Sequence, residues 1–363
     1  MSIILKQEVV QGSYISENKL ILEPIIDPNQ TLPFLESQIL KPDLFKAGIL
    51  QLNQILMAHP GISLNRIYDP VVTVTENYVD FEGFSRFGHS YCKIRFPETL
   101  FKERIRQEGM TNVDFNPQFI RDLRSRSYTP SLWLYIDPDG IELAIDKKAH
   151  ILKKIVMPKW WKDAYQELKY YVNIETMEPH ISEEYNKVIL SGKSFQQLVR
   201  KVENSYLFKH HGVRSLFWDD KSVNLLFGGR KEESVASIKL IEPCNKPARQ
   251  WGVWRIQNLS EIADQIIQAD VYLANKLPSF WILYARSGIQ LLLGYTPYTS
   301  ALWTETARKD IENLLKDPYR DYIEPRRQRR RKKRYKRRIK PKSRINFVQM
   351  HPGQRVIPDF FSN

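Results

Sequence analysis

The chain has 363 residues, 42% of them hydrophobic and 12% aromatic, so it can bury a sizeable core. It carries 55 Lys and Arg against 41 Asp and Glu, a formal net charge of +14. Fourteen of the basic residues and no acidic residue lie in 326–344, which leaves the rest balanced at 41 basic and 41 acidic residues. Dense positive charge attracts polyanions, whereas a balanced body has no such general preference.

Several protein classes are excluded by composition. Two distant cysteines, Cys92 and Cys244, are too few for a disulfide framework or a cysteine-based zinc site. No apolar run approaches the roughly 20 residues of a membrane span, and residues 1–14 lack the apolar core of a signal peptide. We therefore expect a soluble intracellular protein with no membrane association, cytoplasmic, or nuclear in a eukaryotic host.

The first half of the chain favours strands around one helix. Two short strands are expected in 2–10 and 19–26, and apolar residues at helical spacing predict a helix over 43–57. Residues 71–96 alternate apolar and polar side chains, which predicts two or three antiparallel strands with turns near 76–77 and 86–89. The run 132–146 predicts a hairpin, because Pro138 presets φ and Gly140 accepts positive φ in its turn.

The second half repeats this mixture of elements without a repeated sequence. A hairpin is expected over 279–295, turning at 286–288. Further strands are predicted at 214–219, 222–228, 236–242 and 250–256. Further helices are predicted at 158–171, 194–205 with Ser194 as N-cap, 259–269 starting near Ser260, and 304–316.

Strand pairs outnumber strand–helix–strand units, so the predicted fold class is α+β, with mainly antiparallel sheets, packed helices and a disordered basic C-terminal segment. The predicted organisation is a globular body over 1–325, with a possible subdivision near 175–195. A polybasic segment over 326–344 and an apolar tail over 345–363 follow it.

The polybasic segment is the candidate nucleic-acid site. Lys and Arg on such a stretch neutralise phosphates and release counterions, which gives binding that depends steeply on salt and weakly on sequence. The candidate residues are Arg326, Arg327, Arg329, Arg330, Arg331, Lys332, Lys333, Arg334, Tyr335, Lys336, Arg337, Arg338, Lys340, Lys342 and Arg344. A nuclear-import signal, contact with anionic lipid and a solvated tail without a partner stay open.

The tail after this segment carries apolar residues at its end, Phe347, Val356, Ile357, Phe360 and Phe361. It either docks on the body or a protein partner, or frays as an ordinary terminus. Both interpretations stay open.

No catalytic or metal site emerges, and no cofactor is implied. Walker, GxSxG, HExxH and CxxC motifs are absent. Asp139 and Asp146 faintly match a nuclease pattern, but the predicted hairpin separates them by roughly 20 Å. The adjacent His210 and His211 would point to opposite faces of a strand, and 228–231 reads as a tight turn. The eight tryptophans could stack on bases but are more typical of core anchors. We expect no conventional enzyme.

Three stretches, 72–86, 110–125 and 277–303, resemble the region preceding the zinc finger in a group of bacterial SWIM zinc-finger proteins. The family's CxCx(n)CxH motif is absent here, so no zinc ligand carries over. The resemblance implies a non-finger body, with the polybasic run standing about where a finger would be.

Three hypotheses follow. The preferred one is a non-enzymatic nucleic-acid-associated protein that binds the phosphate backbone of DNA or RNA through 326–344. The alternative is a protein-interaction scaffold in a multiprotein complex, whose partner contacts the body or the C-terminal tail. The third is a metal-dependent nuclease with carboxylates assembled from distant segments.

Overall fold

The computed structural model describes residues 15–16, 19–20, 33–57, 70–85, 88–125, 131–146, 148–155, 157, 159–180, 185–207, 213–227, 234–242, 244, 246–274, 277–297 and 303. The chain divides into two compact units, Met1–Ile311 and Glu312–Asn363, and all described residues belong to the first. This unit has an α+β fold, and the strand pairs of its large sheets are antiparallel, as predicted.

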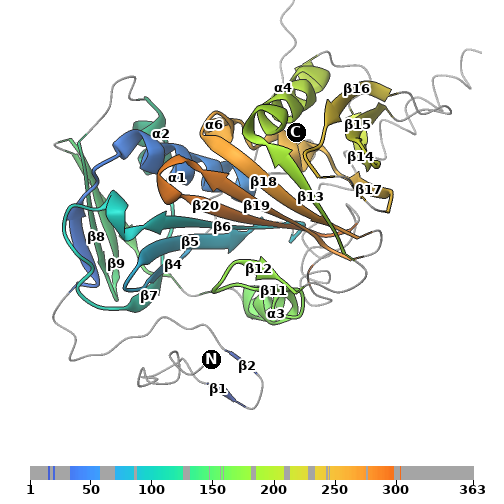
Figure 1. Ribbon diagram of the computed structural model, residues 1–363. Helices are drawn as coiled ribbons and strands as arrows, with labels where there is room; N and C mark the ends of the chain where they lie inside the picture. The colour runs from blue at the N-terminus through green and yellow to red at the C-terminus, as the bar shows by residue number, and fades with distance from the viewer. Residues whose placement is uncertain are drawn as a thin grey trace, which may run out of the picture. The chain divides into compact units, whose positions relative to one another are not determined.

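An eight-stranded sheet forms the centre of the unit (Figure 1). Its strands follow one another in the order β13 (Asn186–Ser191), β18 (Ile266–Leu273), β19 (Ser279–Ala285), β20 (Gln290–Tyr295), β6 (Ser90–Pro97), β5 (Tyr78–Phe84), β4 (Val71–Val74) and β7 (Gly109–Asn112).

Two four-stranded sheets accompany it. One has the order β10 (Lys148–Lys153), β9 (Gly140–Ile145), β8 (Leu132–Asp137) and β3 (Leu35–Gln38). The other has the order β16 (Ser234–Lys239), β15 (Ser222–Phe227), β14 (Val213–Trp218) and β17 (Ala248–Trp251). Two short pairs complete the set, β1 (Ile15–Ser16) with β2 (Lys19–Leu20), and β11 (Val172–Asn173) with β12 (Glu178–Pro179).

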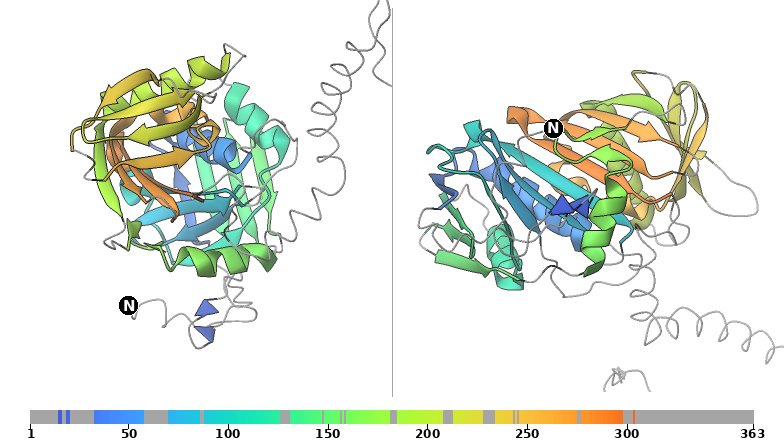
Figure 2. Two further views of the ribbon diagram at one scale, coloured as in Figure 1. Left: turned by 90° about the vertical axis from the view of Figure 1, so that its right-hand side faces the viewer. Right: turned by 90° about the horizontal axis from the view of Figure 1, so that it is seen from below.

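Most helices cover one face of the central sheet. They are α1 (Pro42–Met57), α2 (Pro117–Ser125), α4 (Gly192–Leu207), α5 (Trp254–Gln257) and α6 (Ser260–Ala263). The opposite face carries α3 (Lys159–Leu168) with the β11–β12 hairpin, and the views in Figure 2 show α3 across the sheet from α1. Short 3₁₀ turns occupy Glu98–Leu100 and Arg286–Gly288. None of the described helices is long and apolar enough to span a membrane.

Close packing of α1 on β6 depends on one glycine. A Cβ atom at Gly48 would lie 2.5 Å from Ile94 Cδ1 and 2.7 Å from Phe96 Cζ, so a larger residue there would force these buried side chains to move. The apolar face of α1 is buried on both sides of this glycine, at Phe45 and Leu52. The helical spacing seen in the sequence is therefore the side of α1 that forms the core.

The topology of the unit repeats, although the sequence does not. Residues 35–153 and 186–295 both follow the order strand, helix, four strands, helix, three strands, if α5 and α6 are counted together. In each half the second to fifth strands form one sheet, β6-β5-β4-β7 or β16-β15-β14-β17. The first and last three strands form another, β3-β8-β9-β10 or β13-β18-β19-β20. The central sheet arises where β20 of the second half pairs with β6 of the first.

Most predicted elements are confirmed, and three details are wrong. The helix expected over 259–269 ends at Ala263, because residues from Ile266 onward pair with β13 and β19. The strand expected over 250–256 ends at Trp251, where a helical turn follows. The N-cap of α4 is Ser191 rather than Ser194, since Ser191 Oγ accepts the backbone N–H of Ser194 at 3.1 Å. The predicted elements at 2–10 and 304–316 lie outside the described residues.

Candidate functional site

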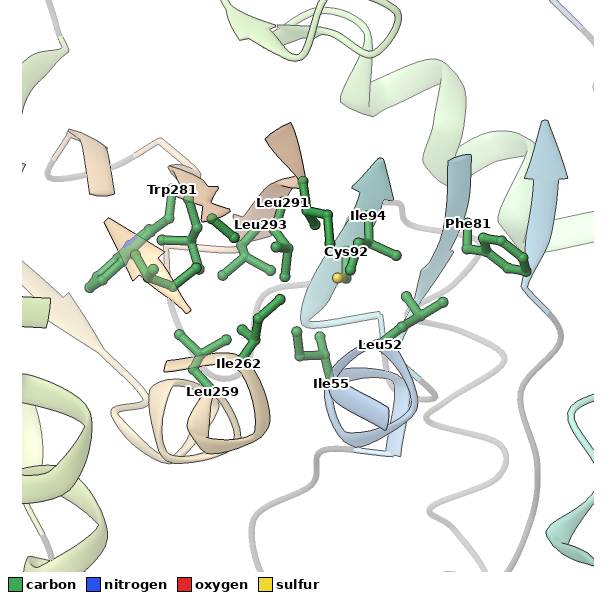
Figure 3. Close-up of a cluster of buried hydrophobic side chains, with 14 of the residues drawn as sticks. Leu52, Ile55, Phe81, Cys92, Ile94, Leu259, Ile262, Trp281, Leu291 and Leu293 are labelled. Carbon is green, nitrogen blue, oxygen red and sulfur yellow. The ribbon is translucent and has the colours of Figure 1, made fainter. Parts of the chain in front are cut away.

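The joint between the halves is a strand pair that is apolar on its helix-covered face. Strands β20 and β6 pair over six residues, from Gln290 with Arg95 to Tyr295 with Ser90. The side chains that face the helices, Leu291 and Leu293 with Cys92 and Ile94, are fully buried against α1 and α6 (Figure 3). Burial on this scale gives the joint the character of a domain core, so the halves form one folded body.

Arg255 fastens one end of this joint. Its Nη1 donates to the carbonyl oxygens of His89 at 3.0 Å and Thr296 at 3.1 Å, one from each half. The side chain is fully buried, and burial lowers the pKa of Arg255 to about 10. The guanidinium therefore stays charged at neutral pH and satisfies buried backbone acceptors.

The repeated topology gives each strand of the joint a counterpart elsewhere. The counterpart of β20 is β10 and the counterpart of β6 is β16. Both counterparts stand at the end of their own sheets, where no further strand among the described residues pairs with them. On β10, Ile151 is 65% exposed. Unpaired edge strands with exposed apolar side chains are templates for pairing with another chain.

A polar triad supports the β10 edge from the side of the helices. Lys148 Nζ pairs with Asp122 of α2, and His150 Nε2 lies 3.3 Å from the same carboxylate without a hydrogen bond. The hydrogen bond from Lys148 lowers the pKa of Asp122. Burial lowers the pKa of His150 and outweighs the attraction of Asp122. His150 is therefore neutral at pH 7 in this environment.

The opposite face of the central sheet holds a buried ion network. Asp80, 1% exposed, accepts hydrogen bonds from Arg95 Nε at 2.9 Å and Nη2 at 2.8 Å, and lies 2.8 Å from Lys93 Nζ. Burial opposes the charge of Lys93, but Asp80 and Glu82 outweigh it and raise the pKa of Lys93. The paired charges therefore stabilise one another inside the body.

Glu82 extends this network toward α3. It accepts a hydrogen bond from Tyr91, and burial raises its pKa despite the attraction of Lys93. Arg95 also donates from Nη2 to the carbonyl of Glu175 at 2.7 Å, which fastens the β11–β12 hairpin to the sheet. The β11–β12 hairpin, which lies between the two halves in sequence, is thus held over the buried charged side chains and shields them from water.

The helix-covered face is close to charge balance. Basic residues of α2 and α4 are exposed there, but Arg124 pairs with Glu261 at 3.2 Å and Arg200 with Asp264 at 3.1 Å. Lys193 and Lys201 add exposed positive charge. This face can approach a polyanion without a large electrostatic attraction of its own.

The residues singled out in the sequence do not form a site in the described part of the chain. Segment 326–344, His210, His211 and 228–231 lie outside it, so their predicted roles stay predictions. Asp139 sits in the β8–β9 turn and Asp146 follows β9. Among the described residues, no three His, Cys, Asp or Glu side chains lie where they could bind one metal ion. Four tryptophans are core anchors, Trp161, Trp218, Trp281 and Trp303.

Sequence reasoning missed the joint and the two free edges. The lengths of some elements and turns do carry a signal of the repeat. Helices α1 and α4 both span 16 residues, and the β4–β5 and β14–β15 turns both leave four residues between their last paired positions, 74 and 79 or 218 and 223. These are similarities of length rather than of residue type, so a search for repeated letters does not find them.

No protein-family model matches the chain, and no curated protein matches it. The SWIM resemblance therefore stays a prediction. Solved structures do match. The chain is similar to a chain of the PCNA2–PCNA3 complex from Sulfolobus tokodaii, with 14% identity, 72% of this chain and 99% of that chain covered, and a TM-score of 0.54.

Two further structures agree. Proliferating Cellular Nuclear Antigen from Entamoeba histolytica has 12% identity, covers 74% of this chain and 100% of its own, and has a TM-score of 0.53. PCNA from Thermococcus kodakaraensis has 12% identity, covers 72% and 99%, and has a TM-score of 0.51. At such identities the likeness shows the fold, and the described body has the PCNA fold.

This finding corrects the preferred hypothesis. A function that rests on the basic segment binding phosphate backbone is wrong, because the fold of the body is that of PCNA chains. The fold favours the alternative hypothesis, a protein-interaction scaffold.

Proposed function

We propose that this protein is a clamp-like scaffold whose subunits assemble head to tail, encircle duplex DNA and hold protein partners there. The observation that carries the proposal is the pair of sheet edges at β10 and β16, with which no further strand among the described residues pairs. These strands are the topological counterparts of β20 and β6, which pair with each other. The fold shared with PCNA chains supports the same arrangement.

The repeat explains how the edges would meet. Within the body, the end strand of one four-stranded sheet pairs with the end strand of another, and this pairing is antiparallel. Strand β10 of one copy would pair with β16 of the next in the same manner. A contact between two different surfaces is heterologous, and it produces a closed ring where the rotation between copies closes.

The helix-covered face supports a topological hold on DNA. Two ion pairs on this face, Arg124–Glu261 and Arg200–Asp264, neutralise two of the arginines that would otherwise attract phosphate. A ring lined by such a face would stay on DNA because it is closed, and would move along it because its phosphate contacts are few.

The test compares closed and open DNA. Protein mixed with nicked circular plasmid is separated from free protein by gel filtration, before and after one restriction cut. We expect the protein to co-elute with the circle and to be lost when the plasmid is cut. Equal retention on both DNA forms would overturn the encircling model, since simple charge attraction does not distinguish them.

A matched pair of variants tests the edge. Ile151→Glu places a charge on the exposed side of β10, whereas Ile267→Glu places it at a similarly exposed position, 57%, on β18. Sedimentation should show the first variant as a monomer and the second assembled like the wild type. A monomeric wild type would refute assembly.

The C-terminal tail is a second candidate surface for protein partners. Ile357, Phe360 and Phe361 recur at the i, i+3, i+4 spacing of apolar anchors on one face of a helical turn. A partner captured after nuclease treatment should persist when 326–344 is deleted and disappear when these three residues are changed to alanine. Persistence in the alanine variant would place the contact elsewhere.

A further inference from the structure

The repeat assigns a counterpart to the inward face of the β10 edge. One inward row crosses the first half, made of Ser37, Leu134, Leu143 and His150. The matching row crosses the second half, made of Val188, Val271, Trp281 and Leu293. His150 therefore lies at an inward position of β10, and the inward positions of the corresponding strand β20 hold Leu291 and Leu293. Lys148 lies two residues earlier on the same face of β10.

The two joints differ sharply in polarity at these positions. Leu291 and Leu293 are fully buried and pack against β6, where Leu293 stands opposite Cys92. On β10 the same face holds a lysine and a histidine. The proposed joint between copies would therefore place a titratable imidazole on the face where β20 has the apolar side chains Leu291 and Leu293.

We propose that His150 makes the joint between copies sensitive to protonation, so that neutral His150 permits β10 to pair with the neighbouring β16 and charged His150 opens it. This inference rests on the proposed head-to-tail assembly. It assigns a regulatory role to the same edge.

The groups around His150 set the sign of the effect. From α2, Asp122 lies 3.3 Å away and the ring of Phe119 packs at 5.7 Å, while Lys148 lies on the same strand. The β9 neighbour, Leu143, is apolar. Asp122 already pairs with Lys148, so a protonated His150 would have to share this carboxylate with Lys148.

Closing the joint would remove the remaining water from His150, which disfavours its charged form. Pairing therefore lowers the pKa of His150 further. The affinity between copies is therefore highest at pH values above the pKa that His150 has in the free subunit. It decreases as the pH falls below that pKa. Each pKa unit between the two states corresponds to about a tenfold change in affinity.

Sedimentation velocity at about pH 8 and about pH 5.5 tests this. For the wild type we expect the dissociation constant to rise once the pH falls below the pKa of His150 in the free subunit, by up to about tenfold for each further pH unit. His150→Leu, which introduces the residue type found at the inward positions of β20, should remove this dependence. His150→Gln removes the titratable group but keeps a polar side chain, and it should also remove the dependence on pH. His180→Gln changes an exposed histidine and should keep the pH dependence of the wild type.

The outcomes separate the two proposals. Wild type that assembles equally at both pH values, or a dependence that persists in both His150→Leu and His150→Gln, overturns the role of His150 and leaves assembly intact. Wild type and variants that are monomeric at both pH values refute assembly itself. Circular dichroism confirms that each variant is folded, and either neutral variant suffices for the comparison.

Discussion

Replacing Asp80 with alanine is expected to destabilise the body strongly. The carboxylate accepts two hydrogen bonds from Arg95 and pairs with Lys93, whose side chains are only 12% and 5% exposed. Alanine would leave both cations buried without their anion. Removing one partner of a buried ion pair costs about 3–5 kcal/mol, because the stranded charge retains its desolvation penalty.

Urea unfolding monitored by tryptophan fluorescence measures this loss. The matched control is Glu36→Ala, since Glu36 and Arg106 form a pair in which both side chains are more than 40% exposed, and such pairs contribute about 0–1 kcal/mol. Asp80→Ala combined with Lys93→Met should be less destabilising than Asp80→Ala alone. A loss for Asp80→Ala no larger than that of the control would refute the reasoning that the network is buried and mutually stabilised.

Three other outcomes are expected. Burial raises the pKa of Glu82, so its contribution to stability should fall as pH rises from about 4 toward 7, and the free energy of unfolding of the wild type relative to Glu82→Gln should fall over that range in urea unfolding; a difference that does not change with pH would contradict it. Arg255→Met should lower the free energy of unfolding by about 2–4 kcal/mol, because the buried carbonyls of His89 and Thr296 would both lose the donor that Nη1 supplies; a stability equal to wild type in thermal unfolding would count against that role. The Cys92 thiol, fully buried with a raised pKa, should react with a thiol reagent only on unfolding, and rapid labelling of native protein would disprove its burial.

Local chemistry predicted much of the secondary structure. The hairpins at 132–146 and 279–295 follow from their turn residues, and α1 follows from its apolar spacing. The error at 259–269 has a tertiary cause. Ile262, Ile266 and Ile267 suit a helix locally, but β18 forms because β13 and β19 supply hydrogen-bond partners on both sides.

The candidate site could not be predicted in the same way. No residue type marks β10 or β16 as special, since their importance lies in which strands they correspond to. His150 reads in the sequence as one histidine among seven. Its meaning depends on a register that runs from β3 across the consecutive strands β8, β9 and β10.

The sequence by itself determined the charge division, the α+β class and the antiparallel pairing, because composition, periodicity and turn residues act over short distances along the chain. The tertiary structure alone decided that two halves share one topology, that β20 and β6 join them, and that β10 and β16 are left as edges. Those features arise from strand pairing between segments up to about 200 residues apart, such as Arg95 with Gln290, and such long-range pairing leaves no local pattern to read.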